Sequence, residues 1–324
     1  MPERPPGNTA LDPVMQSVLE GFLSKLTSEF DLEGHRQMLL AVQPPREALP
    51  ELRIENRAIS YGDLTDIPVR IYWPPTEQQE NLPIVVFYHG GGWVLGFADL
   101  DTHDMVARDH CVVADAIVVS VDYRLAPEHP YPAAVDDSWA ALQWVGEHAV
   151  ELGGDPTRIA VAGDSAGGNL SAVMTQLARD NGGPALVYQL LWYPATTADL
   201  TLPSALENSD APTLKKFQME AAYSLYAPDV DLSEPSRAPT TLAPANATDF
   251  SALPPAYIAT TQCDLLRDDG YRYADLLSAA GVPVEFHNSQ TLPHGYANFA
   301  PVVPAAAETT LLGLQALKAA LKGR

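Results

Sequence analysis

Short apolar runs alternate with amphipathic segments along most of the chain. Short apolar runs, most of them rich in valine and isoleucine or alanine, recur at residues 84–88, 116–121, 159–162, 187–192 and 256–260. Continuous apolar runs of this length predict strands that are buried on both faces. Between them, apolar residues at helical spacing are clearest over 138–152 and 166–178. Strands that alternate with helices predict a mostly parallel central sheet flanked by helices, which is the α/β class of fold.

Three further segments depart from this rhythm. From Leu52 to Trp73 apolar and polar residues alternate around a turn near Gly62, which predicts an antiparallel opening to the sheet. Residues 11–26 predict an amphipathic helix that packs against the protein, because its polar face has little of the positive charge typical of membrane-surface helices. Residues 196–249 are polar and proline-rich with one helical stretch at 214–226, and an interruption of this length predicts an inserted cap.

Composition narrows the classes of protein that the chain can be. Its 324 residues are 46% hydrophobic and carry a formal net charge of -22, so one large domain is expected and nucleic acid is disfavoured as a partner. The two cysteines, Cys111 and Cys263, lie in apolar surroundings and predict buried thiols in a reducing compartment. The N-terminus has no signal-peptide pattern, and no apolar run reaches about 18 residues. We therefore expect a cytoplasmic enzyme without stable membrane insertion.

The strongest chemical signal follows the apolar run at 159–162. That run leads into Gly163-Asp164-Ser165-Ala166-Gly167 and then into a helical pattern. G-x-S-x-G on a strand-to-helix turn is typical of the nucleophile of α/β-hydrolases, where a sharp turn lifts the serine hydroxyl clear of the backbone. The helix N-terminus would place a partial positive charge near the developing oxyanion. Ser165 is therefore the predicted nucleophile, and a glycine-rich turn that only begins a helix is the alternative.

A second glycine-rich segment follows the apolar run at 84–88, with the sequence H-G-G-G-W. Consecutive glycines let a backbone turn and direct N–H groups toward a ligand. In α/β-hydrolases the loop after this strand supplies oxyanion donors. We predict an oxyanion hole from Gly90, Gly91, Gly92 and Ala166, in which Gly90 mainly shapes the turn. A phosphate-binding loop is disfavoured because neither a P-loop lysine nor G-x-G-x-x-G is present.

The order of residues in this fold, serine then acid then histidine, selects the candidate base. Only His287 and His294 follow Ser165, and His89 precedes it and is therefore expected to be structural. His287 lies in the strand-like alternation of 282–288, where a packed or surface histidine is ordinary. His294 lies in a loop just beyond that strand, where an imidazole can face the nucleophile. His294 is the predicted base.

Several carboxylates between the serine and His294 could serve as the acid. Asp264 ends the apolar strand at 256–263, at the edge of the sheet where sites form in open α/β folds. There it would accept the His294 ring N–H and stabilise the imidazolium. Asp268 and Asp269 are alternatives, although their place at a helix start also suits charges beside the helix dipole.

Five motifs together resemble the hormone-sensitive-lipase-like branch of bacterial esterases, family IV of the carboxylesterases in the α/β-hydrolase superfamily. They are HGGGW from His89, DYRLAPEHPYPAA from Asp122, GDSAGGN from Gly163, CDLLRDDG from Cys263 and HGYANF from His294. The motifs stand in family order and the resemblance covers most of the chain from about Asn56 onward. Leu265 stands where the family commonly has proline, a departure that removes no catalytic group.

This resemblance implies a carboxylesterase without metal or cofactor. It would hydrolyse short- to medium-chain acyl esters through Ser165, Asp264 and His294 and an acyl-enzyme intermediate. It also implies one domain over 1–324, with a helical cap formed by about 1–48 and 196–249. An amidase or carbamate hydrolase with the same triad stays open, and so does a small-molecule receptor, although the presence of His294 disfavours the receptor. A homodimer through the sheet edge or the C-terminal helix is suggested by resemblance alone.

Overall fold

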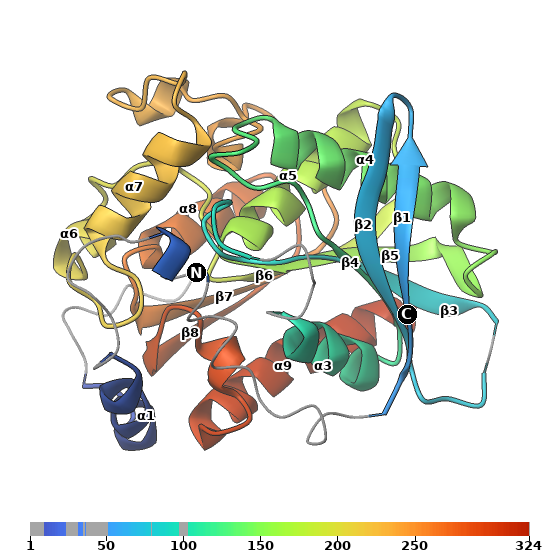
Figure 1. Ribbon diagram of the computed structural model, residues 1–324, viewed down its shortest axis with the longest axis horizontal. Helices are drawn as coiled ribbons and strands as arrows, with labels where there is room; N and C mark the ends of the chain where they lie inside the picture. Colours follow the sequence, from blue (N-terminus) through green and yellow to red (C-terminus); the bar gives the residue numbers. More distant parts are fainter. Residues whose placement is uncertain are drawn as a thin grey trace.

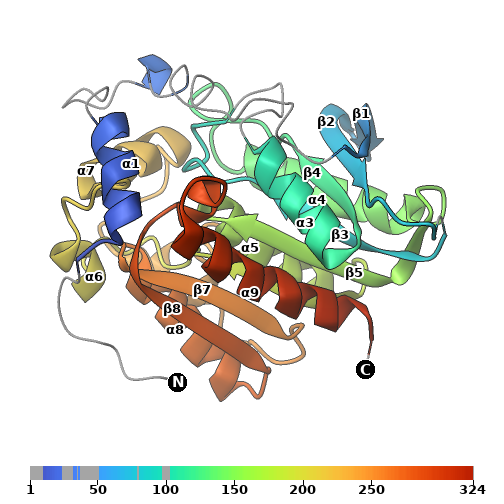
Figure 2. The same cartoon turned by 90° about the horizontal axis from the view of Figure 1, so that it is seen from below.

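A computed structural model of the chain describes residues 10–23, 32–34, 36, 51–78, 80–96 and 103–323. These residues form an eight-stranded sheet with helices on both faces (Figures 1 and 2). The predicted α/β-hydrolase architecture is therefore confirmed. Most of the N-terminal part of the predicted cap, 1–48, lies outside the described residues.

The strands follow the predicted apolar runs closely. They are β1 (Arg53–Tyr61), β2 (Leu64–Trp73), β3 (Leu82–Tyr88), β4 (Ile117–Val121), β5 (Gly154–Asp164), β6 (Leu186–Trp192), β7 (Ala256–Cys263) and β8 (Val284–Pro293). Their order across the sheet is β1-β2-β4-β3-β5-β6-β7-β8. The pairs β1–β2 and β2–β4 are antiparallel and the rest are parallel, as the opening hairpin and the later βα rhythm predict.

Register in the sheet brings separate loops to one edge. Parallel pairing sets Tyr88 opposite Gly163, so the loops that follow β3 and β5 begin side by side. Likewise, Cys263 is opposite Pro293, so the residues that follow β7 and β8 are neighbours. Because the carboxyl ends of parallel strands share one edge, the segments that carry the candidate side chains converge there.

Helices cover both faces of this sheet. One face carries α3 (Asp104–Ala114) and α9 (Pro304–Leu321), and the other carries α4 (Ala133–His148), α5 (Ala166–Asp180) and α8 (Arg267–Ala279), as Figures 1 and 2 show. The helix predicted over 138–152 begins earlier than expected. Pro132, which has no N–H to leave unpaired, immediately precedes it, and Ala134 and Val135 in its first turn are buried.

The insertion and the N-terminal helix lie at the strands' carboxyl edge (Figure 1). The insertion contains α6 (Pro203–Glu207) and α7 (Lys216–Tyr226), together with the 3₁₀ turns η2 (Pro235–Arg237) and η3 (Pro244–Asn246). The helix α1 (Pro13–Leu23) confirms the helix predicted over 11–26 within the described residues. Its Met15 and Leu19 are buried in one cluster with Leu292, so α1 packs against the protein as expected. A further 3₁₀ turn, η4 (Tyr296–Phe299), follows β8.

Two predictions about the chain as a whole can be compared with this fold. Cys111 and Cys263 are both buried and neither is in a disulfide, as their apolar surroundings indicate. Among the helices that the structure describes, none combines the length and apolar character that crossing a bilayer requires.

Candidate active site

Ser165 stands alone between the end of β5 and the start of α5, in a backbone conformation that few residues adopt. Its φ of 55° and ψ of -115° lie outside the regions that L-residues favour, which costs on the order of 1–3 kcal/mol. The turn is held because the Ser165 N–H donates to the Trp192 carbonyl at 2.8 Å and its own carbonyl accepts the Asn169 N–H at 3.0 Å. This is the strained strand-to-helix turn that the sequence predicts.

The glycines beside Ser165 are required by close backbone approach. A β-carbon at Gly163 would collide with the Gly167 carbonyl, and one at Gly167 would collide with the Tyr88 carbonyl at the end of β3. At Gly168 the added atom would lie 2.9 Å from the Pro194 Cβ. These three positions therefore have to be glycine, because the end of β3, the end of β5, the start of α5 and Pro194 approach too closely there for a β-carbon.

Asp264 and His294 come to Ser165 from the ends of β7 and β8. The Nε2 atom of His294 lies 2.9 Å from the Ser165 Oγ, and its Nδ1 lies 2.7 Å from an Oδ of Asp264. All three residues are buried, and Asp264 has no exposed surface. Since an ionised carboxylate only accepts hydrogen bonds, the ring proton sits on Nδ1 and leaves Nε2 as the acceptor for the serine hydroxyl.

Further contacts orient this pair of groups. The second Asp264 oxygen accepts the Leu266 N–H at 2.9 Å. The Tyr193 ring meets the His294 ring edge-on, with 4.8 Å between the centroids. Sequence reasoning missed Tyr193, although its position directly after β6 was a signal, because residues at that point share the edge with the candidate site.

In the loop after β3, two glycines have positive φ angles, a backbone conformation that favours glycine. Gly91 has a φ of 113° and Gly92 a φ of 60°. The Gly91 carbonyl accepts the N–H groups of Val94 and Leu95 and so closes the turn. Within the described part of the chain, the N–H groups of Gly91, Gly92 and Ala166 donate to no protein acceptor.

Gly90 differs from its neighbours and corrects part of the predicted oxyanion set. Its N–H donates to Asp164 Oδ1 at 2.9 Å, so this amide is already engaged within the protein. Gly90 therefore shapes the loop and is removed from the candidate donors. A β-carbon at Gly90 would also collide with the Asp164 carboxylate, which explains why the position is glycine.

Asp164 and His89 form a buried polar layer beneath the site. Burial raises the pKa of Asp164 to about 6, against the opposing effect of His89 and of the Gly90 hydrogen bond. Burial also lowers the pKa of His89 to about 3, so that ring is neutral. The His89 ring stacks on Tyr123 with 4.3 Å between centroids. These contacts fit the structural role expected for His89, whereas the contact between Asp164 and Gly90 was not foreseen.

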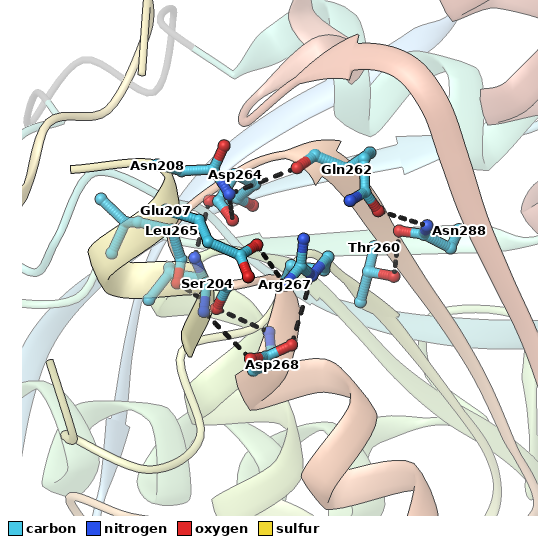
Figure 3. Close-up of polar contacts among 11 residues, drawn as sticks. Ser204, Glu207, Asn208, Thr260, Gln262, Asp264, Leu265, Arg267, Asp268 and Asn288 are labelled. Carbon is cyan, nitrogen blue, oxygen red and sulfur yellow. Dashed lines mark hydrogen bonds and ion pairs between the residues drawn. The ribbon is translucent and has the colours of Figure 1, made fainter. Parts of the chain in front are cut away.

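The two alternative acids, Asp268 and Asp269, face the insertion. Asp269 Oδ1 accepts the N–H groups of Thr196 and Thr197 at 2.9 and 2.8 Å. Asp268 Oδ2 accepts the Ser204 N–H at 3.0 Å (Figure 3). Both carboxylates are buried and bind backbone, so they do more than place charge beside a helix dipole. Among the described residues, no three His, Cys, Asp or Glu side chains are arranged to hold a metal ion.

The sequence is similar to that of a known protein family. A family model for the alpha/beta hydrolase fold matches residues 85–298. Carboxylesterase NlhH of Mycobacterium tuberculosis is 63% identical over 311 residues, which are 96% of this chain and 96% of that protein. Esterase LipI of M. tuberculosis is 54% identical over 315 residues, 97% of this chain and 96% of that protein.

A solved structure extends the likeness to three dimensions. The thermostable esterase of Pseudomonas putida ECU1011 superposes with a TM-score of 0.88 at 32% identity, covering 98% of this chain and 99% of that one. The family match spans the loop after β3, the nucleophile turn and both Asp264 and His294. The chain therefore belongs to the hormone-sensitive-lipase-like family of the α/β-hydrolase superfamily.

Proposed function

We propose that this protein is a serine carboxylesterase that hydrolyses short- to medium-chain acyl esters. Ser165 is the nucleophile, His294 the general base and acid, and Asp264 the carboxylate that orients and stabilises His294. The observation that carries the proposal is the continuous hydrogen-bonded chain from the Ser165 Oγ through His294 to Asp264, at 2.9 and 2.7 Å. The names of the relatives, carboxylesterase and esterase, support the same reaction class.

The first half of the reaction forms an acyl-enzyme. His294 Nε2 takes the hydroxyl proton as the Ser165 Oγ attacks the ester carbonyl carbon, and the carbonyl oxygen becomes an oxyanion. The oxyanion then accepts hydrogen bonds from the N–H groups of Gly91, Gly92 and Ala166, and the partial positive charge at the N-terminus of α5 stabilises it further. The tetrahedral intermediate collapses when His294 gives its proton to the alcohol oxygen, which leaves.

Water completes the cycle by the same route. His294 Nε2 removes a proton from water, whose oxygen attacks the acyl carbon, and collapse returns the proton to Ser165 and releases the carboxylic acid. Asp264 keeps its charge throughout and stabilises the imidazolium that forms twice per turnover. Each oxyanion donor contributes roughly 3 kcal/mol of transition-state stabilisation.

The insertion is proposed to cover the acyl site as a cap, together with the N-terminal segment. The Trp93 ring, in the oxyanion loop, stacks on Tyr226 of α7 with 4.6 Å between centroids. Arg36, from the N-terminal segment, donates to the Val94 carbonyl at 3.0 Å. Because both segments touch the loop that would bind the oxyanion, they are placed to limit the size of the acyl or alcohol group.

Turnover of p-nitrophenyl esters from acetate to decanoate tests this proposal. Wild-type enzyme is expected to prefer the shorter chains, and Ser165→Ala is expected to lose essentially all turnover. Appreciable turnover by Ser165→Ala would contradict the assigned nucleophile. Matched ester and anilide substrates separate an esterase from an amidase, and an organophosphonate that labels Ser165 separates an enzyme from a receptor.

Two wider expectations accompany this function. A cytoplasmic location is supported by two buried cysteines that form no disulfide, since oxidising compartments favour disulfides, and cell fractionation with an antibody would check it. The homodimer stays a prediction that light scattering after size-exclusion chromatography would check.

A further inference from the structure

A short part of the insertion, residues 204–213, hydrogen-bonds to the backbone of both Asp264 and His294. We name residues 204–213 the cap clamp. The Asn208 side-chain amide donates to the carbonyl of Gln262 at 3.3 Å and to that of Asp264 at 3.1 Å (Figure 3). The Thr213 hydroxyl donates to the His294 carbonyl at 2.8 Å. One segment thus holds the backbone of the acid and of the base.

The Asn208 amide bonds to the chain just beyond the residues of β7 that pair with β6. Paired residues between β6 and β7 end at Ala259, and the pairing of β7 with β8 shifts register between Thr261 and Cys263. Gln262 and Asp264 are only 1% and 0% exposed, so solvent does not reach them. In this buried region the Asn208 carboxamide gives each carbonyl a hydrogen bond, and the Asp264 carbonyl also accepts the Arg267 N–H at 3.3 Å.

The cap clamp also bonds to the residues that follow Asp264 in the chain. The Ser204 hydroxyl donates to the Leu265 carbonyl at 2.8 Å and accepts the Asp268 N–H at 3.0 Å. The buried Arg267 guanidinium pairs with Glu207 at 2.9 Å and with Asp268 at 3.2 Å (Figure 3). The cap clamp therefore grips the chain both before and after the carboxylate that faces His294.

We infer that the cap clamp positions the triad, with Asn208 as a positioning residue for Asp264 and Thr213 as one for His294. This inference rests on the proposed function. Proton transfer through His294 depends on two short hydrogen bonds, and a misplacement of about 1 Å in such a group costs about 100-fold in rate. Since both side chains bond to backbone and act through the triad, their loss lowers kcat and leaves KM almost unchanged.

The chain offers matched controls for both substitutions. Asn246, elsewhere in the insertion, also donates its amide to two carbonyls, those of Pro235 and Ala238 at 2.8 and 3.1 Å. Thr309, in α9, donates its hydroxyl to the Ala305 carbonyl at 2.8 Å. Asn246→Ala and Thr309→Val therefore lose the same kinds of bonds as Asn208→Ala and Thr213→Val, without touching the triad.

Steady-state kinetics with p-nitrophenyl butyrate and proton NMR form the test. We expect kcat to fall about 10- to 100-fold in Asn208→Ala and about 10-fold in Thr213→Val, while KM changes less than about threefold. The far-downfield proton resonance of the His294–Asp264 hydrogen bond should broaden or disappear in Asn208→Ala. Both controls should keep wild-type kcat and this resonance.

Two results would overturn the inference: a wild-type kcat in the clamp variants, or losses of equal size in the controls. If Asn208→Ala does not accumulate as folded protein, Thr213→Val decides the question, because valine preserves the shape of threonine. Ser165→Ala separates this failure from failure of the proposed function. Inactive Ser165→Ala with unaffected clamp variants refutes the cap clamp alone, whereas active Ser165→Ala refutes the assigned nucleophile.

Discussion

Asp269→Asn should remove the contribution of one buried carboxyl group to the pH dependence of stability. Burial raises the pKa of the Asp269 carboxyl to about 7 from its ordinary 3.8, although hydrogen bonds from Thr197 and Thr196 oppose that effect. At any pH between these two pKa values, Asp269 has lost its proton in the unfolded chain and still holds it in the folded chain. The free energy of unfolding therefore falls as pH rises through this window.

The size of this fall follows from the two pKa values. Their difference, from 3.8 to about 7, at about 1.4 kcal/mol for each pH unit, is about 4 kcal/mol. A chain of 324 residues has an unfolding entropy of about 0.7 kcal/mol/K, so this free energy corresponds to about 6 °C in Tm. Asparagine keeps an oxygen that accepts hydrogen bonds from the Thr196 and Thr197 N–H groups. Because its side chain cannot ionise, the variant lacks this pH-dependent loss of unfolding free energy.

Differential scanning calorimetry of both proteins from pH 4 to pH 8 provides the measurement. The Tm of Asp269→Asn minus the Tm of wild type should grow by about 6 °C across this range. Asp155→Asn is the control, because hydrogen bonds from Thr157 and Arg158 lower the pKa of Asp155 to about 2 and confine its effect to below about pH 5. A Tm difference that is the same at pH 4 and pH 8 would refute the reasoning.

Three more substitutions test the site itself. Gly167→Ala places a methyl group on the Tyr88 carbonyl. We therefore expect the unfolding free energy to fall by about 3 kcal/mol or more and esterase activity to be lost. A variant with the Tm and turnover of wild type would contradict this expectation. Asp264→Asn should lower kcat about 10⁴-fold at a nearly unchanged Tm, and a loss below tenfold in p-nitrophenyl ester kinetics would argue for another acid. Asp164→Ala frees the Gly90 N–H and loosens the oxyanion loop, so kcat should fall roughly 10- to 100-fold with little change in KM, unless that loop is held by its other contacts alone.

Much of the fold follows from local patterns in the sequence. Largely apolar runs predict β3, β4 and β7 because strands covered by helices on both faces bury every position, and each of these strands is completely buried. The position of Ser165 was predictable for a similar reason. The strained turn between β5 and α5 leaves no room for a β-carbon at Gly163 or Gly167, two residues before and after the serine, so this steric requirement is visible within five consecutive residues.

Other features depend on residues that are distant in sequence. The sequence indicated that Gly90 mainly shapes the turn, but it could not show what engages the Gly90 N–H, because the Asp164 carboxylate lies 74 residues away and bonds to only one of the three amides. Asn208 lies in a polar stretch where hydrophobic periodicity carries no signal. Its contact with the Asp264 backbone spans 56 residues.

The sequence by itself determined the strand and helix rhythm, the nucleophile turn, the glycine-rich loop and the order of serine, acid and histidine, because each is a short-range pattern with a local steric or chemical cause. The sequence favoured Asp264 as the acid because it ends a buried strand, but it left Asp268 and Asp269 as alternatives, and the tertiary structure decided among the three. Asp264, Asp268 and Asp269 stand within six residues of one another, but the end of β7 turns only Asp264 toward His294, at 2.7 Å, while α8 directs the other two to the insertion. Such a choice depends on strand register and on packing across the whole sheet, and these are set by contacts that no local pattern records.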